Sequence, residues 1–102
     1  MTFLYKYKDT VTTKIIADYQ KKTVVIENYT DDMLHRAFGV NEHPSFADFE
    51  NFLESRCFPR TRDHMKLHLK ELGISCYEPL SIIQKTHGRL EGDFMSLEIV
   101  RN

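Results

Sequence analysis

The first part of the chain alternates between apolar and polar residues with the two-residue period of a strand. The alternation runs through Phe3–Lys8, resumes with β-branched residues in Val11–Ala17 and returns in Thr23–Ile26 after a polar interruption. These segments are joined by connections too short for the crossover that parallel strands require. The pattern therefore predicts a three-stranded antiparallel meander, with a tight turn near Lys8–Thr10.

After Asn28 the apolar residues recur every three or four positions, which is typical of helices that bury one face. Phe46, Phe49 and Phe52 share such a face with Leu53, so that helix is expected to belong to the core. Capping residues, prolines and glycines delimit the helices. The expected helices lie between Thr30 and Gly39, between Ser45 and Pro59, between Thr61 and Gly73, and from Pro79 to before Gly88.

The third expected helix buries Met65, Leu69 and Leu72, whereas Leu67 lies off that face. Beyond a turn at Gly92, the segment Phe94–Val100 alternates again and predicts a last strand. The fold class is therefore expected to be α+β. It combines an N-terminal antiparallel three-stranded meander, four short helices and a C-terminal strand returning to the sheet, packed as two layers.

Length and composition indicate a single soluble domain over residues 1–102. The chain has 102 residues, of which 41% are hydrophobic and 28% charged, which argues against long disorder and against membrane spanning. The segment Met1–Asp9 lacks the basic start and apolar stretch of a secretory signal, so we expect a cytoplasmic protein. With a net charge of −1, any nucleic-acid role must rest on a local patch.

Four segments follow one another as in a known family. They are the hairpin Tyr7–Asp18, the motif Ser55–Arg62 with arginines on both sides of a proline, the Leu-Lys-Glu-Leu-Gly-Ile sequence of Leu69–Ile74, and Gly88–Ile99. Together they span almost the whole chain. In order and motif they resemble the segment that precedes the kinase domain in HipA-like proteins of Gram-positive bacteria.

The chain differs from that family in what it lacks. Family tryptophans are replaced by Phe52 or Leu53 and by Met95, and no segment looks like a phosphate loop, a catalytic Asp with its partner Asn, or a magnesium-binding Asp motif. Phosphoryl transfer is therefore not implied. The resemblance implies a free-standing copy of an accessory module, of the kind found in mobile elements and phage-derived operons, where small proteins bind larger machines.

The side chains that could ligate zinc are Cys57, His64, His68 and Cys76. His64 and His68 are four residues apart on one expected helix, but each cysteine stands alone, whereas structural zinc sites show close pairs. The favoured interpretation is that both cysteines are small buried residues and the histidines are partly exposed. Cys57 lies near Arg56 and Arg60, which could lower its pKa, but no signature of nucleophilic catalysis accompanies it. We expect no metal, no cofactor and no enzymatic activity.

A stripe of cations is the most informative electrostatic feature. Arg62, Lys66 and Lys70 recur every four residues on the third expected helix, and Arg56 and Arg60 precede them. This basic stripe could contact DNA phosphates, or it could be the solvated face of a helix. A third possibility is that Arg56 and Arg62 are structural, which the two arginines around the proline of the family motif favour.

The uncovered face of the sheet is a second candidate surface. Tyr5, Tyr7, Tyr19 and Tyr29 could supply amphipathic contact area there, or could instead cap the edge of the core. An edge strand could also recruit a second copy and give a homodimer.

The resulting hypothesis is a non-catalytic module that binds a larger protein in a mobile-element, toxin or defence-system setting, as an inhibitor or accessory subunit of a nucleic-acid-handling enzyme or kinase. Arg60, Lys66 and Lys70 are predicted to meet an acidic surface, and Tyr5 and Tyr7 to serve as anchors. The alternative is a small DNA-binding transcriptional regulator that uses the basic stripe. Its contacts would be Arg56, Arg60, Arg62, Lys66 and Lys70.

Overall fold

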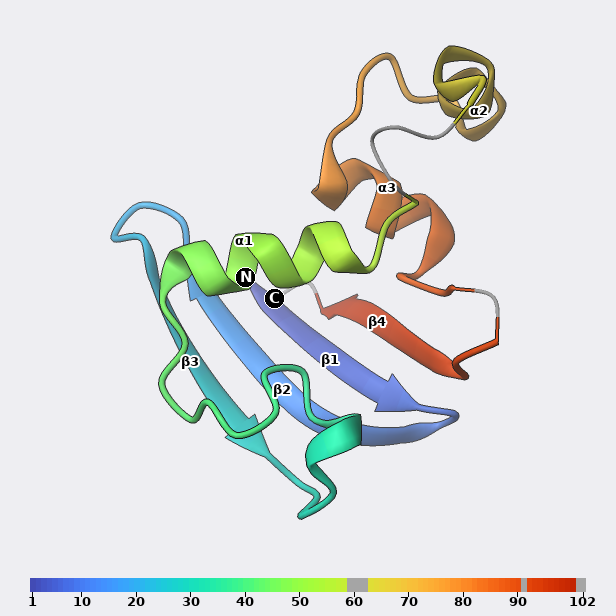
Figure 1. The fold of residues 1–102 in the computed structure, drawn as a ribbon. Coiled ribbons are helices and arrows are strands. Elements are labelled where there is room, and N and C mark those ends of the chain that lie inside the picture. The colour runs from blue at the N-terminus through green and yellow to red at the C-terminus, as the bar shows by residue number, and fades with distance from the viewer. Residues whose placement is uncertain (59–62, 91, 101–102) are drawn as a thin grey trace.

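The computed structural model describes residues 1–58, 63–90 and 92–100, and it forms an α+β fold (Figure 1). The strands pair in the order β3-β2-β1-β4, and all three pairings are antiparallel. The expected meander and returning strand therefore make one sheet. The elements are β1 (Thr2–Tyr7), β2 (Thr10–Asp18), β3 (Thr23–Asn28), a 3-10 turn η1 (Met33–His35), α1 (Phe46–Ser55), α2 (Met65–Leu72), α3 (Pro79–Thr86) and β4 (Met95–Val100).

Helix α1 lies across one face of the sheet, and its local sequence explains where it begins (Figure 1). The Ser45 side chain accepts a hydrogen bond from the main-chain N–H of Asp48, while the Asp48 carboxylate accepts one from the main chain of Ser45. These two bonds satisfy N–H groups that have no partner inside the helix, as in a capping box. The hydrogen bonds that the Asp48 carboxylate accepts from the main chain and the side chain of Ser45 hold its pKa below the usual value.

The core lies between the sheet and helices α1 and α3. Phe3 and Ile15 from the sheet are fully buried, as are Phe49 from α1 and Ile82 from α3. The Phe3 and Phe49 rings pack with their centroids 5.3 Å apart. The predicted apolar face of α1 is thus confirmed, because Phe46, Phe52 and Leu53 are buried as well.

The prediction of a helix between Thr30 and Gly39 is wrong, because only the 3-10 turn η1 forms there. Asp32, and not Thr30, caps this turn through the N–H of Leu34. One contact with β2 and one within the segment take the place of the helical hydrogen bonds. The N–H of Ala37 donates to the hydroxyl of Thr13 in β2, and the Arg36 side chain donates to the carbonyl of Thr30.

Helix α2 stands apart from the sheet at one end of the molecule (Figure 1). It ends at Gly73, as expected, with that glycine in the left-handed conformation that terminates helices. Leu69 is buried, while Leu67 is 56% exposed and lies off the packed face as predicted. The expected cap at Thr61 lies outside the described residues. A bilayer requires a longer and more apolar helix than any in the described part of the chain.

Candidate protein-binding surface

One face of the sheet is covered by no helix of the described residues and exposes apolar side chains, and we call it the open face. Phe3, Ile15 and Leu97 are buried on the side of the sheet that the helices cover, where Phe3 packs on Phe49 of α1, so their neighbours in the strands point to the opposite side. The open face contains a hollow of about 560 Å³. Its walls include Leu4, Val11, Lys14, Ile16, Tyr29 and Val100. Side chains of β1, β2 and β4 and the residue after β3 therefore form one shallow concavity.

Three large apolar residues of the open face are strongly exposed. Ile16 is 44% exposed, Tyr29 50% and Val25 63%. Ile16 and Val25 are directly opposite each other in the pairing of β2 with β3, so they form a contiguous patch. Grouped exposed apolar side chains in a small protein indicate a surface that another molecule covers, whereas single ones need no explanation.

Polar groups surround this apolar patch. Lys14 lines the hollow, and across the sheet the Lys6 ammonium lies 2.8 Å from the Glu98 carboxylate. Partial desolvation and the adjacent Glu27 carboxylate raise the pKa of Tyr29. Like any tyrosine hydroxyl, that of Tyr29 is protonated at neutral pH and can donate a hydrogen bond. An apolar centre with a polar rim is the usual composition of a protein interface.

The structure corrects the expected roles of Tyr5 and Tyr7. Tyr5 is only 7% exposed and meets Phe52 edge-on, with ring centroids 5.1 Å apart, so it belongs to the core and is not available as a surface anchor. Tyr7 is half-buried and stacks on His35, with ring centroids 4.0 Å apart. Both follow Phe3 in the alternation of β1, which places them on the helix-covered face. Among the four tyrosines considered, Tyr29 reaches the open face.

Arg56 follows the last residue of α1, and its side chain is buried inside the protein instead of lying on a basic surface. Its guanidinium lies 2.7 Å from the Asp93 carboxylate and donates to the carbonyl oxygens of Gly88 and Met95. It also lies 5.5 Å from the centroid of the Tyr5 ring. The planar fork of arginine suits these simultaneous contacts. Arg56 therefore ties α1 to β4 and to the turn before it, which agrees with the structural interpretation and removes it from the expected DNA contacts.

The rest of the basic stripe is partly described. Lys66 and Lys70 are exposed on α2 and line a second hollow of about 510 Å³, together with Leu69 and Ile74. Arg60 and Arg62 lie outside the described residues. The described lysines thus flank an apolar floor on one side of α2.

The cysteines and histidines considered as zinc ligands do not form a metal site among the described residues. Cys57 is buried, with its thiol 3.3 Å from the carbonyl oxygen of Leu53, whereas Cys76 is exposed, which corrects the expectation that both are buried. The His68 ring packs edge-on against Phe58. Within residues 1–58, 63–90 and 92–100, histidines, cysteines and carboxylates form no group of three that could hold a metal ion.

Comparisons with known proteins identified no relative of this chain. No protein-family model matches it, and searches of curated proteins and of solved structures found no match either.

Proposed function

We propose that this chain is a non-catalytic binding module that docks onto a larger protein through the open face of its sheet. The observation that carries the proposal is the exposed apolar patch of Ile16, Val25 and Tyr29 beside a hollow of about 560 Å³. Burial of this patch against a partner would supply the main driving force, because apolar area removed from water contributes about 25 cal/mol per Å². The polar rim would set the orientation of the partner.

The resemblance to the HipA-like accessory segment supports one class of partner. In that family the segment precedes a kinase domain, so the resemblance favours a kinase domain as the partner. We assign the chain the role of an accessory or inhibitory subunit of such a kinase, in a toxin, defence or mobile-element setting. Lys66 and Lys70 would provide a second contact with an acidic part of the partner.

Substitutions on the open face test this proposal. Isothermal titration would use the full chain and a HipA-like kinase domain from which its own accessory segment has been removed. The double variant with Ile16→Asp and Val25→Asp is expected to bind about 100-fold more weakly, because two carboxylates would be desolvated in an apolar contact. Thermal melting would verify that both variants remain folded.

Val40→Asp is the matched control, since Val40 is an exposed aliphatic residue in the connection from η1 to α1. We expect its affinity to stay within about twofold of the wild type. Equal binding by the double variant would contradict docking through the open face. Failure of the wild type to bind the kinase domain would contradict the proposed partner.

The alternative function, DNA binding, is favoured by Lys66 and Lys70, which are four residues apart and both exposed on α2. If these lysines neutralise two phosphates, the logarithm of duplex affinity should fall with the logarithm of salt concentration with a slope of about −1.8. The variant with Lys66→Glu and Lys70→Glu should flatten the slope. Binding isotherms on a nonspecific duplex at two salt concentrations measure this, and no binding at low salt would exclude the alternative.

A further inference from the structure

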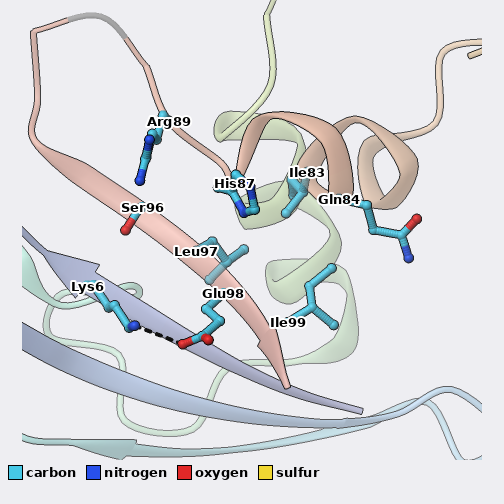
Figure 2. A pocket seen from close by; sticks show the side chains of 9 residues that line it. All are labelled: Lys6, Ile83, Gln84, His87, Arg89, Ser96, Leu97, Glu98 and Ile99. Atoms are coloured by element: carbon cyan, nitrogen blue, oxygen red, sulfur yellow. Dashed lines mark ion pairs between the residues drawn. The ribbon is translucent and has the colours of Figure 1, made fainter. Parts of the chain in front are cut away.

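A cavity of about 420 Å³ lies beside the outer edge of β4, on the side away from β1, and we call it the edge groove. Its walls come from α3, from the turn after it and from β4, and the Lys6 side chain of β1 reaches it beside Glu98 (Figure 2). Ser96 and Glu98 face it from one side of the strand, while Leu97 and Ile99 face it from the other. The space therefore wraps the strand edge, where main-chain groups point outward.

The register of β4 shows which main-chain groups face the edge groove. The N–H of Lys8 donates to the carbonyl of Phe94, and the pairing of β1 with β4 continues in the same register as far as Thr2 and Val100. In an antiparallel pair the residues that bond to the partner strand alternate with residues that point away from it. The main-chain carbonyl of Phe94 points toward β1. The N–H and C=O groups of Met95, Leu97 and Ile99 therefore point away from β1.

The protein itself occupies the first half of this edge. The N–H of Met95 donates to Asp93, its carbonyl accepts from Arg56, and the N–H of Leu97 donates to the carbonyl of His87. No described residue bonds the carbonyl of Leu97 or the N–H and carbonyl of Ile99. A strand edge left open in this way is a template for another extended chain.

The side chains around the open part of the edge indicate what chain would fit. Ile83 and Leu97 form an apolar floor and are each 1% exposed. Of the charged groups in the wall, Lys6 and Glu98 pair with each other at 2.8 Å. The guanidinium of Arg89 has no ion-pair partner among the described residues, so the uncompensated charge is positive. Figure 2 shows Arg89 near Ser96 at one end of the groove and Gln84 near the other.

We propose that the edge groove binds an extended peptide that adds a strand antiparallel to β4, with a carboxylate at its C-terminal end facing Arg89. Antiparallel pairing is the more stable arrangement per residue, and it runs the peptide from Ile99 toward Ser96, so its C-terminal end reaches Arg89. The free groups of Leu97 and Ile99 supply main-chain hydrogen bonds, and the floor accepts an apolar side chain. The carboxylate belongs either to an acidic side chain or to the chain terminus.

This site goes beyond the proposed function, because it lies at the edge of the sheet and its occupant is a flexible segment, not the folded surface of a kinase. The two proposals can therefore fail separately. Selection of peptides needs no kinase domain, and the substitutions at Ile16 and Val25 do not touch the walls of the edge groove.

The test uses the full chain as bait for a displayed library of random heptapeptides with free carboxyl ends. Enriched peptides should carry Asp, Glu or the free carboxylate at the C-terminal end, preceded by β-branched residues. Arg89→Glu should weaken binding of the best synthetic peptide at least about tenfold. Lys85→Glu is the control, because Lys85 is an exposed cation of α3 that does not line the groove, and it should stay within about twofold.

Two further forms of the peptide locate the contacts. An amidated peptide that retains affinity assigns the carboxylate to a side chain, and one that loses it assigns the carboxylate to the terminus. Methylation of the peptide nitrogen that donates to Leu97 or Ile99 should abolish binding, and the amide signal of Ile99 should shift on titration. No enrichment, indifference to Arg89→Glu, or shifts centred on Ile16 and Val25 would each overturn the proposal.

Discussion

Replacing Arg56 with leucine is expected to lower the free energy of unfolding by about 3 kcal/mol. The side chain of Arg56 is 7% exposed, and it holds the Asp93 carboxylate at 2.7 Å as well as the carbonyl oxygens of Gly88 and Met95. Leucine can fill much of the volume but donates no hydrogen bond. The buried carbonyl oxygens would then lose their donor, and the Asp93 carboxylate would keep only the N–H of Met95 and contact with water.

Urea denaturation of both proteins at neutral pH measures this loss. Lys66→Leu is the control, because Lys66 is an exposed cation and should change stability by less than about 0.5 kcal/mol. A loss below about 1 kcal/mol for Arg56→Leu would contradict the structural role given to this residue.

Acid titration provides a second readout of the same contact. Burial raises the pKa of Asp93, but the hydrogen bond from Arg56, the N–H of Met95 and the charge of Arg56 outweigh it and hold the pKa below its usual value. A lowered folded-state pKa contributes stability above the ordinary carboxyl pKa, and this contribution disappears as the pH falls through the lowered value. Arg56→Leu should therefore reduce the loss of stability on acidification.

Phe49→Ala is expected to be the most destabilising single truncation in the core, with a loss of about 4 kcal/mol. Phe49 is fully buried, and its ring centroid lies 5.3 Å from that of Phe3 and 5.5 Å from that of Phe46. Alanine would leave a cavity between α1 and the sheet that these rings cannot fill without leaving their rotamers. Urea denaturation again supplies the measurement.

The same substitution at an exposed position is the control. Phe94 is 67% exposed before β4, so Phe94→Ala should cost less than about 1 kcal/mol. Similar losses for the two variants would mean that Phe49 does not lie in the core described here.

Those parts of the fold that depend on local sequence could be predicted from the chain. The cap at Ser45, the phenylalanine spacing of α1, Pro79 at the start of α3 and the alternation of β1 all act within a few residues, and each is confirmed. The segment after Thr30 has equally good helix signals, but it is held instead by contacts such as the hydrogen bond that the N–H of Ala37 donates to distant Thr13. Such tertiary contacts override local propensity.

The sequence predicts that one face of the sheet is uncovered, but it does not predict which residues lie on that face. Alternation divides β1 into two sets of residues, and it does not say which set the helices cover, so it leaves open whether Tyr5 and Tyr7 lie on the uncovered face or at the core; the structure places them on the helix-covered side. A better signal was present in β2 and β3. Ile15 and Ile16 are adjacent, as are Val24 and Val25, and adjacent apolar residues in a strand place one on each face.

The edge groove and the role of Arg56 depend on which distant residues meet, and no local pattern contains that information. Arg56 reaches Asp93 across 37 positions of sequence. The motif around Pro59 favours a structural arginine, but it does not contain the carboxylate that pairs with Arg56 in the folded chain.

The most direct test of docking through the open face is methyl cross-saturation in the complex with the HipA-like kinase domain. The methyl groups of Leu4, Ile16 and Val25 should lose intensity when the kinase is irradiated, because they lie on the open face, while those of Leu34 and Val40 should not. Saturation confined to Leu67 on α2, with Ile16 and Val25 unaffected, would contradict the account.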